Sequence, residues 1–188
     1  MSDGDAARLA RRWEHVRYRW LLPLTVRGGA AAAAYAALCA RFVWRIDVPR
    51  REAAVARITR WLGVTEPHAG EIYLGALRSE AREEADSRWL MSRDGLPSMH
   101  VVGTEPDCAA TCVWATLHFG SPVLAYLHLR RTRGVDVQIV GRPLDEENPM
   151  SAVKRTWGER KVAWVEAQSG IPVLGVSPEA TAIARSRL

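Results

Sequence analysis

The chain has 188 residues and a net charge of +5, and it is 48% hydrophobic and 25% charged. These values indicate an ordinary globular protein with a real core and exclude a low-complexity or fibrous chain. The excess of basic residues favours anionic partners such as phosphates, an acidic carrier protein, anionic lipid or RNA, without choosing among them.

The N-terminal half predicts helices. Residues 28–46 form an Ala-rich apolar run, and residues 49–62 and 67–91 place apolar side chains at helical spacing. We therefore expect residues 1–95 to be a helical region.

The Ala-rich run contains Arg41 and Arg45 and is not an unbroken apolar stretch of about 20 residues, so a simple membrane span is not expected. Arginines and tryptophans lie just upstream of it. This combination leaves two interpretations of residues 11–46, a peripheral contact with a lipid interface or a helix packed on the domain.

The character of the sequence changes at Gly95. Runs rich in β-branched residues predict short strands, and the segments between them predict helices. The expected strands are 99–105, 112–117, 135–141, 161–167 and 171–176, and the expected helices are 122–132, 147–157 and 178–188. This alternation predicts an α/β fold for residues 96–188, a mostly parallel sheet with flanking helices, forming one globular unit with the helical region.

The three cysteines, Cys39, Cys108 and Cys112, show no disulfide-framework spacing, and no signal peptide is present. A reducing cytoplasm is the expected location. If residues 11–46 contact lipid, the protein is expected to lie on the inner face of the membrane. No second ligand pair accompanies Cys108 and Cys112, so buried free thiols are expected, with neither a metal nor a cofactor.

His118 is the principal candidate for a functional residue. It follows the predicted strand 112–117, and Ser121 with Pro122 marks a helix start just after it. Ligands of open α/β sheets bind at this edge, where the helix N-terminus favours negative charge. A histidine there suits a general base, whereas a polar residue in a turn is the alternative.

A second candidate segment is GRPLDEENP, residues 141–149, which joins a predicted strand to a helix. Arg142 would leave the sheet at the same edge as His118 and could hold a phosphate or a carboxylate. A solvated turn with its acidic residues near a helix N-terminus is the alternative. The acidic residues are Asp145, Glu146 and Glu147.

The segments VVGTE (101–105), CVWATLHFGSPVLA (112–125) and VDVQIVGRPLDEENP (135–149) together resemble the lipid A late acyltransferases of bacteria. These form the lauroyl/myristoyl branch of the lysophospholipid acyltransferase superfamily. The resemblance implies an α/β core and a histidine base, here His118. It implies that this base activates a hydroxyl or amine to attack an acyl thioester. It also implies that Arg142 contacts substrate. We expect the further substrate-binding residues to be Gly120, Ser121, Asp145, Glu146 and Glu147.

The sequence departs from the family pattern at one position of the motif. The family has Asp or Glu five residues after the histidine, where this chain has Val123. Loss of the acid in a comparable triad costs about 10⁴ in rate. Asp145, Glu146 or Glu147 could replace it in orienting His118. The family also continues beyond the last predicted helix, so we expect a shortened relative or a sheet completed by a partner chain or a second copy.

Three functions follow from these observations. The first is an acyltransferase-like enzyme that takes its acyl group from acyl-CoA or an acyl carrier protein, in a specialised pathway rather than lipid A synthesis. The second is a catalytically degenerate relative that acts as a binding or partner subunit. The third is acyl transfer from another anionic donor such as aminoacyl-tRNA, which is the one nucleic acid expected as a partner.

Overall fold

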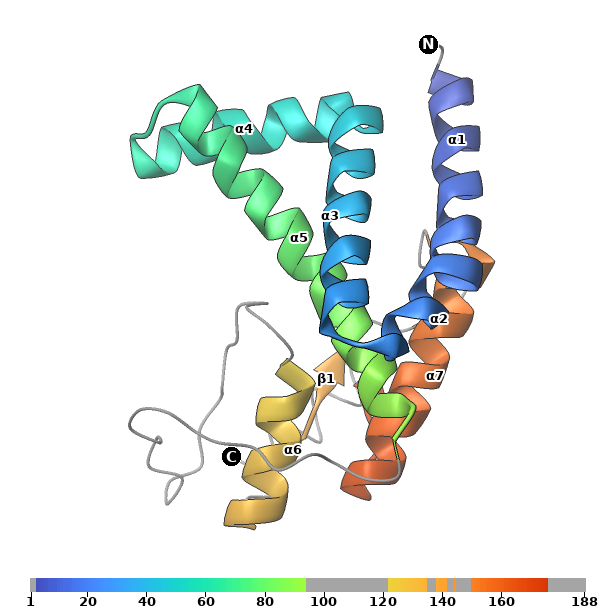
Figure 1. Ribbon diagram of the computed structural model, residues 1–188. Coiled ribbons are helices and arrows are strands. Elements are labelled where there is room, and N and C mark those ends of the chain that lie inside the picture. The colour runs from blue at the N-terminus through green and yellow to red at the C-terminus, as the bar shows by residue number, and fades with distance from the viewer. Residues whose placement is uncertain (1–2, 94–121, 135–137, 142–143, 145–149, 176–188) are drawn as a thin grey trace. The chain divides into compact units, whose positions relative to one another are not determined.

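The computed structural model describes residues 3–93, 122–134, 138–141, 144 and 150–175 (Figure 1). The chain divides into two compact units, Met1–Ser92 and Arg93–Leu188. Within the described residues the fold is predominantly helical.

The first unit consists of helices joined by short turns (Figure 1). Its chain rises through α3, crosses in α4 and returns along α5. In chain order the elements are α1 (Asp3–Val16), the π-helical turn η1 (Arg17–Leu21), α2 (Leu22–Leu24), the 3₁₀ turn η2 (Thr25–Arg27), α3 (Gly29–Ile46), α4 (Val48–Leu62) and α5 (Glu66–Met91).

Local sequence signals determine where α4 begins and ends. The side chain of Asp47 accepts a hydrogen bond from the Arg50 backbone N–H at 3.3 Å, and Pro49 occupies the first turn. Gly63 ends the helix with a positive φ of 65°, a conformation that costs glycine little.

Small side chains allow α3 and α5 to pack closely. The buried face of α5 repeats every four residues through Ala69, Tyr73, Leu77, Ala81 and Ala85. The facing side of α3 buries Ala32, Tyr35, Ala36, Cys39 and Ala40. Helical side chains four residues apart share one face, so these alanines form two smooth surfaces that bring the helices together.

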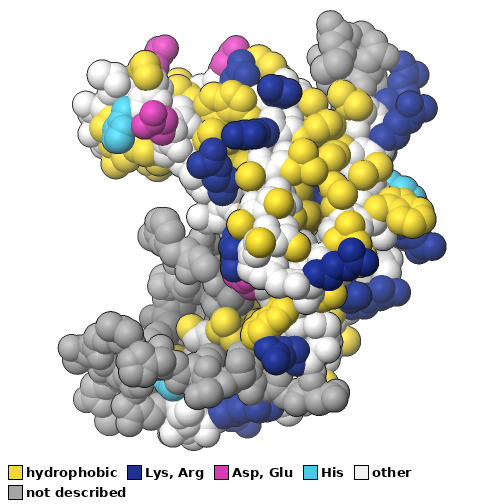
Figure 2. All heavy atoms as spheres, viewed as in Figure 1, with side chains coloured by type: hydrophobic (Ala, Val, Ile, Leu, Met, Phe, Trp, Pro, Cys, Tyr) yellow, Lys and Arg dark blue, Asp and Glu magenta, His cyan; other side chains and the backbone are white. Residues whose placement is uncertain are grey.

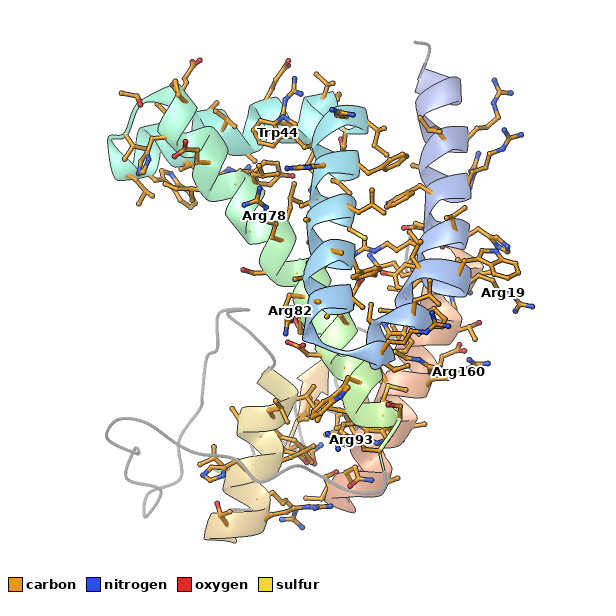
Figure 3. All side chains as sticks on the ribbon, viewed as in Figure 1. Arg19, Trp44, Arg78, Arg82, Arg93 and Arg160 are labelled. Carbon is orange, nitrogen blue, oxygen red and sulfur yellow. The ribbon has the colours of Figure 1, made fainter. Side chains whose placement is uncertain are left out.

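Trp44 lies where α3, α4 and α5 meet (Figure 3). Its ring centroid is 6.0 Å from that of Tyr73, and the Arg51 guanidinium lies 5.4 Å from the indole centroid. A Cβ atom on Gly70 would lie 3.2 Å from the Trp44 ring, so glycine at this position gives the indole its space.

The second unit contains α6 (Pro122–Arg133), β1 (Val140–Gly141), α7 (Ala152–Ser169) and β2 (Leu174–Gly175). The strands pair in parallel, with Val140 opposite Leu174 and Gly141 opposite Gly175. The helices α6 and α7 pack through a cluster of buried residues, Tyr126, Leu127 and Val165.

The prediction of helices in the first half is confirmed, whereas the predicted α/β core with a mostly parallel sheet is wrong for the described residues. Their strands are two residues long each. The predicted strand 161–167 lies inside α7, and the predicted helix 147–157 begins only at Ala152. The helix expected at 122–132 is confirmed as α6. The predicted segments 99–105, 112–117 and 178–188 lie outside the described residues.

Capping explains why residues 161–167 are helical. Ser151 accepts a hydrogen bond from the Lys154 backbone N–H at 3.4 Å, and Gly170 ends the helix with a φ of 71°. These two signals enclose a helix of 18 residues. A short apolar run within it does not distinguish strand from helix by periodicity alone.

Candidate functional site

The candidate site residues from the sequence all lie outside the described residues, so their geometry remains a prediction. They are His118, Gly120, Ser121, Arg142, Asp145, Glu146 and Glu147. The structure describes the elements that flank them in the chain, which are α6 after the first segment and β1 and α7 on either side of the second.

Val123, at the position where the resembling family has an acid, is a packing residue. Its half-buried side chain lies in the first turn of α6 against the cluster of Tyr126, Leu127 and Val165. Ile139 and Val173, which precede the two strands, pack against the same cluster. An apolar side chain in this position contributes to the core and offers no hydrogen bond to a histidine.

Leu144 is held against α7. A Cβ atom on Gly158 would lie 3.0 Å from Leu144 Cδ1 and 3.3 Å from Cδ2. Only glycine leaves that space without displacing the leucine. Leu144 stands between Arg142 and Asp145 in the sequence, so this contact fixes one point of the second candidate segment.

Side-chain hydrogen bonds secure the end of α7 and the start of β2. Glu166 Oε1 accepts from the Val173 backbone N–H at 2.8 Å, and Ser169 Oγ accepts from the Ile171 N–H at 3.2 Å. Across the strand pair, Gln138 Nε2 donates to the Pro172 carbonyl at 2.6 Å. These contacts satisfy backbone groups that such short strands leave without ladder partners.

Two arginines of α6 contact the C-terminal end of α7. Arg130 Nε donates to the Ser169 carbonyl at 3.2 Å, and Arg131 Nη2 donates to Gln168 Oε1 at 2.8 Å. Cations favour a helix C-terminus, where carbonyl groups lack intrahelical partners. These two arginines therefore contribute to the packing of α6 against α7.

A buried polar cluster in the first unit was not predicted from the sequence. Arg17 Nη2 lies 2.5 Å from Glu84 Oε2, and Arg17 Nε donates to Tyr35 Oη at 3.1 Å. The Tyr18 hydroxyl donates to Glu84 Oε1 at 2.6 Å, and the Tyr35 hydroxyl donates to Glu84 Oε2 at 2.8 Å. Together, Arg17, Tyr18, Tyr35 and Glu84 connect η1, α3 and α5.

Burial and charge pairing shift the titration of this cluster. Burial and the Glu84 carboxylate raise the pKa of Tyr18 and of Tyr35 far above the ordinary tyrosine value. Burial opposes the charge of Arg17, but the nearby Glu84 carboxylate raises the pKa of Arg17 overall. The tyrosines therefore stay neutral donors, and Arg17 stays charged.

The arrangement of the cluster indicates a structural role. Both oxygens of Glu84 already accept hydrogen bonds, and the guanidinium binds two partners within the unit. The sequence signal for it is weak, namely a tyrosine inside an alanine run and a glutamate beside a buried stripe. Its members are brought together by packing between segments far apart in the chain.

The described residues contain no candidate metal site. Among them, no group of three or more His, Cys, Asp and Glu side chains is placed to hold a metal ion. Cys39 is a buried free thiol, and burial raises its pKa from 9.0 to about 11. Cys108 and Cys112 lie outside the described residues.

None of the described helices combines the length and the apolar character that a bilayer crossing requires. Comparison with protein-family models, curated proteins and solved structures finds no match to this chain.

Proposed function

We propose that the chain is an acyltransferase-like enzyme that moves an acyl group from a thioester donor, acyl-CoA or an acyl carrier protein, to a hydroxyl or amine. His118 acts as the base. The observation that supports this most is the cluster shared by Val123 and Ile139. His118 lies five residues before Val123, and Arg142 lies three residues after Ile139. Each candidate segment therefore lies within a few residues, along the chain, of a side chain that packs in the same core.

The start of α6 supports the same proposal. The helix begins at Pro122, directly after the segment HFGS, as the motif requires. A helix N-terminus carries a partial positive charge and exposed N–H groups, which favour the anionic groups of an acyl donor. The strand β1, which pairs in parallel with β2, ends at Gly141, and Arg142 is the next residue in the chain.

The reaction needs only the proton transfers of a histidine. His118 removes a proton from the acceptor oxygen or nitrogen, which attacks the thioester carbonyl carbon. The tetrahedral intermediate then breaks its C–S bond, and the protonated His118 returns the proton to the leaving thiolate. Arg142 binds an anionic group of the donor, such as a phosphate.

An orienting acid is needed for efficient catalysis, and Val123 cannot supply it. Asp145, Glu146 and Glu147 are the candidates, since they directly follow Leu144, which packs against Gly158 of α7. An amine acceptor requires less activation than a hydroxyl, so we expect amines to react faster than alcohols when the base is poorly oriented.

The first test is a mass-spectrometric assay of the purified full chain with acyl-CoA and acyl-carrier donors and simple amine and alcohol acceptors. His118→Ala should abolish donor consumption. The matched control is His68→Ala, because His68 is an exposed histidine of α5, 58% exposed at its side chain. Equal turnover in both variants would exclude His118 as the base.

The second candidate function is a non-catalytic relative that binds an acyl carrier. The packing of Val123 into the core favours it, because the acid position has become a core position. No turnover by the wild type, together with binding of an acyl carrier protein that Arg142→Gln weakens, would support this role in place of catalysis.

A further inference from the structure

The first helical segments carry a row of exposed apolar side chains. Leu9, Val16, Trp20 and Leu24 are 37%, 41%, 64% and 44% exposed. Leu9 and Val16 are seven residues apart in α1, so at about 3.6 residues per turn they lie within roughly 20° of one direction. Trp20 follows in η1 and Leu24 in α2. We call these four side chains the α1 stripe.

The surroundings of the stripe are strongly basic. Between residues 8 and 27, Arg8, Arg11, Arg12, Arg19 and Arg27 are exposed, and Glu14, the one acidic residue in that range, is only half exposed. Arg17, the remaining arginine, is buried against Glu84. Figure 2 shows arginine and hydrophobic side chains side by side along the edge formed by α1, and Arg19 points away from the other helices in Figure 3.

The Ala-rich helix α3, in contrast, is a packed helix. It buries Tyr35 and Cys39 against the unit, and its Phe42 stacks on Trp13 of α1 with ring centroids 3.9 Å apart. This stacking fixes α1 on α3. Leu9 lies one turn from Trp13 on the same side of α1, so the α1 stripe borders the packed face and its side chains remain partly exposed. Among the large apolar side chains of α3 only Leu38 is exposed, at 48%, so the row of apolar side chains that could contact lipid is the stripe.

We propose that the α1 stripe binds the surface of an anionic bilayer, with α1 lying parallel to the membrane plane. The leucines, the valine and the Trp20 indole would enter the boundary between headgroups and acyl chains, and the arginines would bind lipid phosphates. Apolar side chains with tryptophan beside an arginine row are the composition of interfacial helices. Charge complementarity selects anionic over neutral lipid.

A bilayer suits this surface better than an acidic protein does. The stripe runs over about 22 Å from Leu9 to Leu24 at a rise of about 1.5 Å per residue. The row crosses α1, η1 and α2, and a plane of lipid can cover such an exposed row without a matching groove. An acidic protein remains an outcome of the test.

The experiment is co-sedimentation of the full chain with vesicles of phosphatidylcholine alone and of phosphatidylcholine with 30% phosphatidylserine, about that fraction being enough for a negative surface potential. Binding is expected only to the anionic vesicles and should weaken with added salt. Trp20→Ser with Leu24→Ser should lower the partition coefficient at least about fivefold. Arg12→Gln with Arg19→Gln should lower it roughly fivefold per arginine.

The matched control is Trp61→Ser with Leu62→Ser at the end of α4, where the side chains are still more exposed, at 75% and 61%. This variant should bind as the wild type does. Equal losses in control and stripe variants would overturn the proposal, because they would show adhesion of any exposed apolar group. No binding of the wild type to anionic vesicles, with Arg12- and Arg19-dependent binding to an acyl carrier protein, would overturn it in favour of a protein partner.

Discussion

Arg17 and Glu84 form a buried ion pair between η1 and α5, with the Arg17 Nη2 atom 2.5 Å from Glu84 Oε2 and side chains only 10% and 13% exposed. The two residues are 67 positions apart in the chain. Two tyrosine hydroxyls donate to the same carboxylate, so every strong acceptor of the pair is used. Removing either member would leave the other charge buried without a partner. The pair therefore favours the arrangement of η1 and α5 in which both charges meet.

Glu84→Gln should destabilise the first unit by about 3–5 kcal/mol, since it leaves the Arg17 charge without compensation. The control lies on the same helix, where Arg82 and Asp86, two residues before and two after Glu84, form an exposed ion pair at 2.9 Å. Asp86→Asn should cost no more than about 0.5 kcal/mol. Hydrogen exchange of α5 peptides measures both. Similar losses for the two variants would show that the buried pair is not a stabilising contact.

Alkaline pH should weaken the first unit through Tyr18 and Tyr35. Their pKa values are raised above the ordinary 10.0 by burial and by Glu84. Below pH 10 both states keep these protons, so the stability is fully present. Above pH 10 the unfolded state releases protons that the folded state retains, so the free energy of unfolding falls. Each tyrosine contributes up to about 1.4 kcal/mol per pH unit.

The measurement compares urea unfolding at pH 9 to 11, a range of about one unit on either side of the ordinary tyrosine pKa, for the parent and for Tyr18→Phe with Tyr35→Phe. Both proteins should carry Cys39→Ala, because the Cys39 thiol, with its pKa raised to about 11, titrates in the same window. The phenylalanine variant should be less stable at pH 9 but should lose less with rising pH. Parallel curves for the two proteins would contradict the assignment of the slope to the tyrosines.

The helices of the first unit could be predicted because their signals are local. The Asp47 cap, Pro49 and Gly63 mark the ends of α4, and Ala54 and Ile58, four positions apart, mark the side that packs against Tyr73 and Leu77. The strand predicted at 161–167 was wrong because Val162, Trp164 and Val165 suit either structure, and the deciding caps lie outside that run.

At the candidate site, too, the sequence shows which residue is present but not which elements it packs against. The replacement of the acid by Val123 is visible in the sequence, but its packing against Tyr126 and Val165 depends on how α6 meets α7. The Arg17–Glu84 pair could not be predicted, because nothing local to η1 indicates a carboxylate 67 residues away. Periodicity identifies buried faces but does not identify which faces meet.

Val123→Asp should destabilise the second unit by roughly 2–4 kcal/mol, because it removes an apolar contact and places a carboxylate against the cluster. Ala125→Asp is the control, since Ala125 lies on the exposed side of the same first turns of α6. Its cost should stay below about 0.7 kcal/mol, the size of a helix-propensity difference. Hydrogen exchange of α6 and α7 peptides measures both. A Val123→Asp chain as stable as the control would mean that position 123 faces solvent or a polar site.

Gly158 and Leu144 should be energetically coupled, because a Cβ atom at position 158 would lie 3.0 Å from Leu144 Cδ1. Glycine to alanine inside a helix normally gains about 1 kcal/mol. Gly158→Ala should gain less than this or lose stability, since Leu144 must move, whereas the same change in a Leu144→Ala background should gain the full amount. Gly75→Ala in α5 is the control, as nothing lies within 4 Å of its Cβ position. Equal effects of Gly158→Ala in both backgrounds would show that Leu144 does not rest on α7. Under the proposed function, Leu144→Ala should also slow acyl transfer without unfolding α7, because Leu144 stands between Arg142 and Asp145 in the sequence and packs against Gly158.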